Sequence, residues 1–175
     1  MGKISIDAFL REYNVAAKQK GTAMESFIKK HITTQYVDFI IKEAYCENIM
    51  KATCYKKDGE RKFVKVNSAS RYLFFVMRLI DLYTDIEINQ DKVWEDYDKL
   101  NEVGAINTLI AAIPESEYSE FSTLLNMKMD DFRDNEYSIT ALLYNFKESL
   151  ALTEEVIQSV LDNPKIKELL ATDTE

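Results

Sequence analysis

The fold is decided by residues 71–83, which read RYLFFVMRLIDLY. Apolar residues here would occupy every side of a helix, and the run from Leu73 to Met77 is unbroken. A helix that is apolar all round is buried on most of its sides. We therefore expect residues 71–83 to form the central helix of the protein, with Ser68 as the cap at its start.

Helical spacing of apolar residues continues on both sides of this stretch. The clearest case is a stripe over four turns, made of Val37, Ile40, Ile41, Ala44, Tyr45, Ile49 and Ala52. Ser5 is the predicted cap of a first helix, and Thr22 with Glu25 has the spacing of a capping box. Further helices are predicted over 93–100, 106–113, 118–125, 139–150, 153–161 and 164–170. The chain has only four Gly and two Pro in 175 residues, too few for many tight turns.

These patterns predict one all-α domain over residues 1–175, a compact bundle of seven to nine helices. At this length a single domain can bury a sizeable core without disulfides. Apolar residues make up 46% of the chain, which excludes a disordered protein.

One stretch departs from the helical pattern, between residues 55 and 66. It places Asp58-Gly59 between two short arms, which predicts a small β-hairpin or an ordered loop. The surrounding residues 51–71 carry seven Lys and Arg against two acidic residues. Because ordered loops often carry function, we expect a charged contact with a partner here; the alternative is ordinary solvated loop charge. The predicted partner-binding residues are Lys56, Lys57, Arg61, Lys62 and Lys65.

Charge is unevenly distributed along the chain, whose net charge is −8. Residues 1–80 carry fifteen basic and eight acidic residues, a net of +7, and residues 81–175 carry seven and twenty-two, a net of −15. Generic nucleic-acid binding is therefore not expected, since it favours a strongly basic surface. Two arrangements remain open: a basic patch and an acidic patch on different sides of the protein, or a basic segment that folds onto the acidic C-terminal surface and is neutralised there.

No catalytic or cofactor-binding motif is present. The single histidine, His31, has no acidic partner nearby in sequence, and a structural role is expected for it. Oxygen-bearing residues alternate from Asp85 to Asp91, but the Gly and Glu that an EF-hand needs are missing, so a capped connector is expected. Cys46 and Cys54 have no metal-binding spacing and are about 12 Å apart if they share one helix, so two reduced thiols are expected. We expect no metal, no cofactor and no enzymatic activity, although a dispersed active site would leave no such signal.

The longest uncharged run, residues 103–114, is too short to span a membrane. No secretory signal is visible at the start of the chain, because Asp7 interrupts the first apolar residues. We expect a cytoplasmic protein without membrane contact.

Several segments resemble small helical proteins encoded in the head and tail gene clusters of tailed phages and prophages of Gram-positive bacteria. They are residues 67–72 (NSASRY), 82–87 (LYTDIE), 97–101 (YDKLN) and 129–132 (MDDF). The resemblance runs over most of the chain, contains no diagnostic motif and transfers no catalytic residue. It implies a virion component or an assembly factor (a tail assembly chaperone, a connector or a capsid accessory) located in the host cytoplasm or the virion.

The expected function is a non-enzymatic interaction with other protein subunits, including further copies of this chain. The alternative is a phage-encoded inhibitor of a host defence system. In that case the acidic residues, especially those in 81–136, would mimic nucleic acid.

Overall fold

The computed structural model describes residues 2–19, 22–58, 61–137, 158–159 and 161–164, and only the backbone of 56–58, 61–64 and 136–137. The chain divides into two compact units, residues 1–128 and 129–175. The single domain over 1–175 stays a prediction. The helices predicted over 139–150, 153–161 and 164–170 lie wholly or largely outside the described residues.

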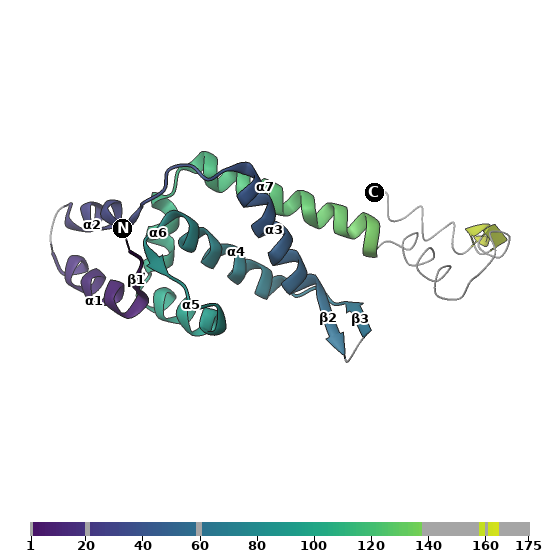
Figure 1. The fold of residues 1–175 in the computed structure, drawn as a ribbon, viewed down its shortest axis with the longest axis horizontal. Coiled ribbons are helices and arrows are strands. Elements are labelled where there is room, and N and C mark those ends of the chain that lie inside the picture. The colour runs from purple at the N-terminus through teal and green to yellow at the C-terminus, as the bar shows by residue number, and fades with distance from the viewer. Residues whose placement is uncertain (1, 20–21, 59–60, 138–157, 160, 165–175) are drawn as a thin grey trace. The chain divides into compact units, whose positions relative to one another are not determined.

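The described part of the chain is predominantly helical, so the predicted all-α class is confirmed (Figure 1). Its α-helices are α1 (Ile6–Ala17), α2 (Ala23–His31), α3 (Phe39–Cys54), α4 (Ser68–Tyr83), α5 (Val93–Glu102), α6 (Ala105–Ala112) and α7 (Glu115–Phe132). Two short helical segments are η1 (Gln90–Lys92) and η2 (Arg133–Tyr137). None of the described helices is both long and apolar enough to span a membrane.

Helix α4 is the centre of the first unit, as its sequence predicts. It packs against α3, α5 and α6, and its Phe75 ring lies edge-on to Phe121 of α7, with 5.4 Å between centroids. The helix is buried on most of its sides, as expected; Tyr72 is its one exposed residue between 71 and 83, and Phe74 is partly covered. The buried residues follow a helical stripe: Ser70, Leu73, Phe75, Val76, Met77, Leu79, Ile80 and Tyr83.

Two small sheets accompany the helices. Strands β2 (Tyr55–Asp58) and β3 (Arg61–Val64) are antiparallel, with Tyr55 opposite Val64, which confirms the predicted hairpin. Strands β1 (Ile4–Ser5) and β4 (Ile86–Glu87) pair in parallel, with Ile4 opposite Ile86. The parallel pair was not predicted, because strands of two residues are too short to show an alternating pattern.

The helix caps are partly as predicted. Ser5 caps α1, its hydroxyl accepting a hydrogen bond from the Ala8 amide. The predicted capping box at Thr22 is wrong: its backbone (φ −86°, ψ 14°) is not extended, and its side chain makes no capping hydrogen bond. Helix α4 is capped by Asn67 and not by Ser68, which is its first residue.

Candidate interaction surfaces

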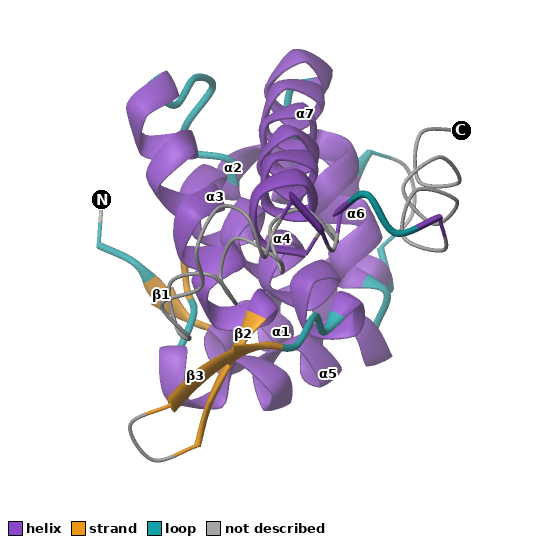
Figure 2. Cartoon of the chain, turned by 90° about the vertical axis from the view of Figure 1, so that its right-hand side faces the viewer, coloured by secondary structure: helices purple, strands orange, loops and turns teal. Residues whose placement is uncertain are grey.

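The β-hairpin is an arm at the end of the α3–α4 helix pair. β2 continues directly from α3, and two backbone hydrogen bonds fix its root: Lys65 N to Cys54 O at 2.9 Å and Asn67 N to Thr53 O at 2.7 Å. Both ribbon views show the strands extending past the helices (Figures 1 and 2). The arm therefore has a fixed origin and projects away from the helices that carry it.

Four of the five predicted partner-binding residues lie on the two strands of this arm. The ladder pairs Lys57 with Lys62 and Asp58 with Arg61, and Lys56 lies opposite Phe63. Lys65, just after β3, is exposed. Like charges at one ladder position destabilise a hairpin, so the Lys57–Lys62 register gives the arm no stability of its own. The structure thus brings the predicted residues together on one element.

A second surface, the α3 apolar patch, is not apparent from the sequence pattern. It consists of Tyr36, Phe39, Ile40 and Ile41, at the start of α3. Tyr36, Phe39 and Ile40 expose 64%, 55% and 74% of their surface. Single exposed apolar residues are ordinary, but four within six positions are a local concentration of the kind found at interaction sites.

This patch corrects the stripe predicted over residues 37–52. Ile40 and Ile41 were placed on the same face as Ile49, yet they are exposed while Ile49 is buried. The covered face of α3 instead follows a polar-containing series of Lys42, Cys46, Ile49, Met50, Thr53 and Cys54. Its spacing is helical, but a lysine opens it, and a lysine is not expected on a buried face without a partner.

The buried lysine belongs to an ion-pair network beneath the patch. Lys42 Nζ lies 2.9 Å from Glu117 Oε2 and also bonds the Glu120 carboxylate, both on α7. The same Glu117 oxygen accepts from Tyr83 Oη at 2.7 Å and from the Val37 amide at 3.0 Å. The network therefore joins α3, α4, α7 and the segment before α3, and it holds the backbone next to Tyr36 in place.

The pKa shifts in this network follow from its geometry. Burial alone would lower the pKa of Lys42, but its hydrogen bonds to Glu120 and Glu117 outweigh burial and raise it. Burial alone would raise the pKa of Glu117, yet the hydrogen bonds from Lys42, Tyr83 and the Val37 amide lower it. Burial, followed by the hydrogen bond to Glu117, raises the pKa of Tyr83. Lys42 and Glu117 are therefore both charged at neutral pH.

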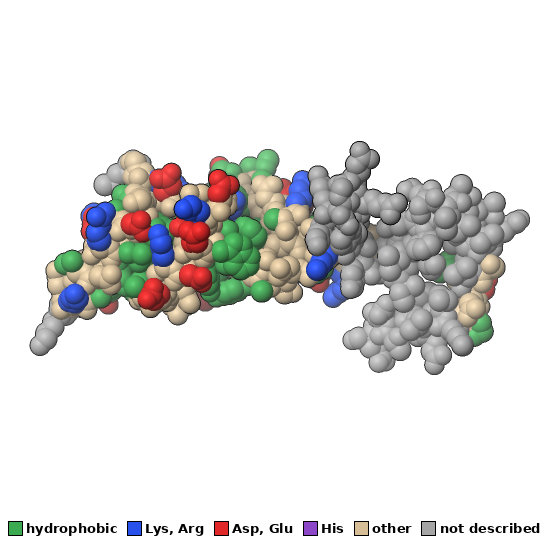
Figure 3. Space-filling model, turned by 90° about the horizontal axis from the view of Figure 1, so that it is seen from below, with side chains coloured by type: hydrophobic (Ala, Val, Ile, Leu, Met, Phe, Trp, Pro, Cys, Tyr) green, Lys and Arg blue, Asp and Glu red, His purple; other side chains and the backbone are tan. Residues whose placement is uncertain are grey.

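Another exposed aromatic group lies on α4 and α5. Tyr72 and Trp94 are exposed, and the Tyr72 ring contacts that of Tyr97 with 6.5 Å between centroids. Trp94 belongs to the helix predicted over residues 93–100, and it is exposed while Val93 and Leu100 of that helix are buried. Seen from below, hydrophobic side chains of the described residues gather in one area beside a group of mixed charges (Figure 3).

His31 is buried and held by groups distant in sequence. Its Nδ1 lies 2.8 Å from Asp85 Oδ1, and the Phe9 and Phe27 rings contact the imidazole. Its Nε2 has no hydrogen-bond partner among the described residues, and the nearest carboxylate, that of Glu12, is 4.0 Å away. Such a His–Asp pair can orient a general base, but aromatic rings pack against this one and its exposed fraction is only 2%. The geometry fits the expected structural role.

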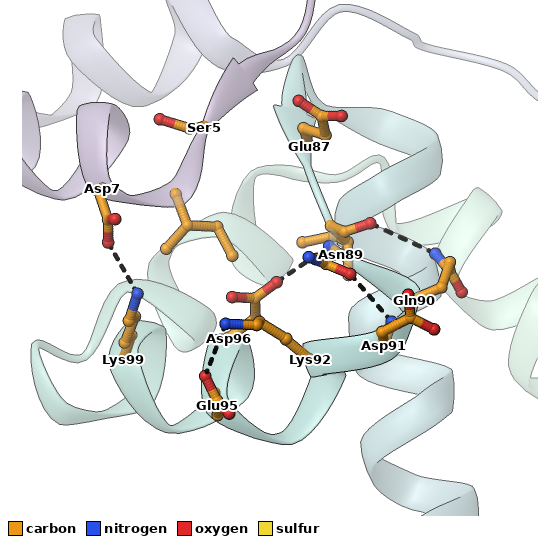
Figure 4. Close-up of a pocket in the computed structure, with 12 residues that line it drawn as sticks. Ser5, Asp7, Glu87, Asn89, Gln90, Asp91, Lys92, Glu95, Asp96 and Lys99 are labelled. Atoms are coloured by element: carbon orange, nitrogen blue, oxygen red, sulfur yellow. Dashed lines mark hydrogen bonds and ion pairs between the residues drawn. The ribbon is translucent and has the colours of Figure 1, made fainter.

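A polar cavity of about 670 Å³ lies between the start of the chain and α5 (Figure 4). Its rim includes the stretch that resembles a calcium loop, but the oxygens there are used within the fold. Asn89 Oδ1 accepts from the Asp91 amide and Asp96 Oδ2 from the Asn89 amide. Ile86 and Ile88 are buried, as expected for a connector. Within the described residues, no group of three or more His, Cys, Asp and Glu has a geometry for holding a metal ion.

Both cysteines are buried on α3. Cys46 Sγ is 3.9 Å from the Phe121 carbonyl oxygen, and burial raises its pKa to about 12. Because the thiolate is the reactive form, a thiol with this pKa is a packing residue and a poor nucleophile.

Comparison with models of protein families, with curated proteins and with solved structures finds no match to this chain. The surfaces described above are therefore the basis for any functional conclusion.

Proposed function

We propose that this chain is a non-enzymatic protein-interaction module that contacts its partner through the basic β-hairpin. Within that class, the resemblance of its sequence segments to phage head and tail gene products favours a virion component or an assembly factor. The observation that carries the proposal is the hairpin itself. It gathers Lys56, Lys57, Arg61 and Lys62 on an arm that extends past the helices and begins at a fixed point.

The lysine charges of the arm do not stabilise it as a hairpin. Lys57 and Lys62 occupy one ladder position, where their like charges oppose hairpin formation. Residues 55–65 carry five basic and two acidic residues, a net of +3. A positively charged arm of this kind steers and binds an acidic protein surface, and the attraction weakens as salt is added.

The alternative function, inhibition of a host defence system by nucleic-acid mimicry, has less support. A mimic needs its carboxylates arrayed on the surface. Within residues 81–136, however, Asp85 binds His31, Asp96 accepts a backbone hydrogen bond and Glu117 belongs to the buried network. These three carboxylates serve the fold, whereas others in the range, among them Glu87, Glu95, Glu102 and Asp130, are exposed and remain available to such a surface.

The experiment compares two double charge reversals. Lys57→Glu/Lys62→Glu changes the arm but keeps like charges at the shared ladder position, so the stability of the hairpin is little altered. Lys18→Glu/Lys29→Glu changes two exposed lysines elsewhere by the same total charge. Immobilised variants are then tested for capture of virion or assembly proteins from infected-cell extract at 0.05 and 0.5 M salt.

We expect the hairpin variant to lose at least tenfold in captured partner at low salt, and the control to retain it. Equal capture by both variants would show that the hairpin is not the partner-binding surface. Capture of nucleic-acid-processing enzymes that is unaffected by the hairpin variant would instead support the inhibitor.

A further inference from the structure

Most of the surface of Tyr36, Phe39 and Ile40 in the α3 apolar patch is left uncovered by the described residues. Exposing such side chains forgoes the stabilisation that their burial would give. A group of this kind, next to a well-packed core, is what a docking surface requires.

The patch is rigid before any partner arrives. The Val37 amide bonds Glu117, the Lys42 ammonium lies 5.2 Å from the centre of the Tyr36 ring, and Lys42 itself is held by Glu117 and Glu120. Surfaces that are already ordered lose less conformational entropy on binding. The buried network therefore orders the residues around the patch before binding and lowers the entropic cost of binding a partner.

The charges around the patch identify the chemistry of that partner. Two exposed carboxylates border it: Asp38 directly precedes Phe39 at the start of α3, and Glu120 of α7 bonds Lys42 beside the Tyr36 ring. Together with the buried pair of Lys42 and Glu117, these residues have a net charge of −2. An apolar centre with an acidic rim fits a partner segment that combines apolar and basic residues.

This chain contains such a segment in its own hairpin. Residues 55–65 have a net charge of +3 and include the apolar residues Tyr55, Phe63 and Val64. The hairpin and the patch therefore match in charge and in apolar character.

The two surfaces lie at opposite ends of one helix. The patch is at the first turn of α3, and β2 starts directly after its last residue, Cys54. A helix of 16 residues is about 24 Å long, so a molecule cannot place its own hairpin on its own patch. Contact between the two surfaces requires a second copy.

We infer that the β-hairpin of one copy docks on the α3 apolar patch of the next, so that copies of this chain associate head to tail. The inference rests on the proposed function, in which the hairpin binds a protein partner, and names a second copy as that partner. A contact between different surfaces uses one patch and one hairpin per interface. It produces rings when the rotation closes and filaments when it does not.

The experiment uses two variants that each lack one surface. Phe39→Lys/Ile40→Lys reverses the patch, and Lys57→Glu/Lys62→Glu reverses the hairpin. Phe39 and Ile40 are exposed, so the fold is expected to tolerate both changes. The matched control, Val15→Lys/Trp94→Lys, charges two other exposed apolar residues. Mass in solution is measured by light scattering at 0.05 M and 1 M salt.

We expect the wild type and the control to exceed the monomer mass of 20.3 kDa at low salt, and less so at high salt. Each interface variant alone should have the monomer mass. An equimolar mixture of the two variants should form a species of twice that mass and nothing larger, because only one intact patch and one intact hairpin can meet.

Three results would overturn the inference: a monomeric wild type, a hairpin variant that still dimerises through the patch, or a mixture that stays monomeric. None of them decides the proposed function. That proposal is judged by the capture experiment, in which the hairpin variant loses captured virion or assembly proteins whether or not the chain also binds a second copy.

Discussion

Helices α3 and α4 are neighbours with 16 residues each, yet they bury different kinds of side chain. α4 covers its apolar stripe, as a helix that serves stability does. α3 covers a lysine and a threonine and leaves Phe39 and Ile40 in solvent. The difference indicates that the residues of α4 serve the packing of the core, whereas the first residues of α3 form a surface that faces solvent.

The largest expected effect comes from making the same substitution on both helices. Phe75→Ala on α4 removes a buried ring and should lower the free energy of unfolding by about 3–5 kcal/mol. Phe39→Ala on α3 removes an exposed ring and should change it by less than about 0.5 kcal/mol. Urea denaturation of both variants measures the difference. Equal losses would show that the patch is covered in solution.

The buried charge of α3 gives the next largest effect. Lys42→Met should cost about 3 kcal/mol, since it leaves the Glu117 carboxylate buried without its cation. The double variant Lys42→Met/Glu117→Gln should cost clearly less than the sum of the two single changes. A double-mutant cycle by urea denaturation measures this coupling. Additive losses would show that the two side chains do not interact.

The same network predicts a smaller dependence of stability on pH. The folded-state pKa of Glu117 lies below its ordinary value of 4.5, so its contribution is complete above that pH and is lost as the pH falls through the folded pKa. The folded-state pKa of Lys42 lies above 10.5, so its contribution is lost as the pH rises beyond that value. Denaturation of the wild type and of Glu117→Gln between pH 3 and 7 tests the acid limb. We expect a shallower loss of stability in Glu117→Gln, and parallel curves would contradict the assignment.

The smallest effect concerns the starts of the two helices. Asn67 accepts a hydrogen bond from the Ser70 amide, so Asn67→Ala should cost about 1 kcal/mol. Asp38 at the start of α3 makes no side-chain capping bond, and Asp38→Ala should cost only a few tenths through the helix dipole. Thermal unfolding of both variants provides the comparison. A larger loss of stability in Asp38→Ala than in Asn67→Ala would contradict this prediction.

The sequence predicts the elements of this protein better than their surroundings. Two features could be predicted: the central position of residues 71–83 and the hairpin over 55–66. Both depend on local sequence, an apolar run in the first case and an Asp-Gly turn in the second. The burial of Lys42 could not be predicted, because its partner Glu117 lies 75 positions further along the chain. His31 and Asp85 meet in the same way, 54 positions apart. The exposure of Ile40 and Trp94 was also missed, since periodicity finds an apolar stripe but not whether a neighbour covers it.

The parallel pairing of β1 with β4 has a consequence for the order of events during synthesis. Ile4 cannot pair with Ile86 until 82 further residues have been synthesised. At translation rates of roughly 5–20 residues per second this takes about 4–16 s. During that interval the Ile4 amide lacks the Asp85 carbonyl and His31 lacks the Asp85 carboxylate. The nascent α1–α2 pair, in which the rings of Phe9 and Phe27 are in contact, therefore lacks part of its native hydrogen bonding at this stage. These hydrogen bonds form only after Asp85 has been synthesised.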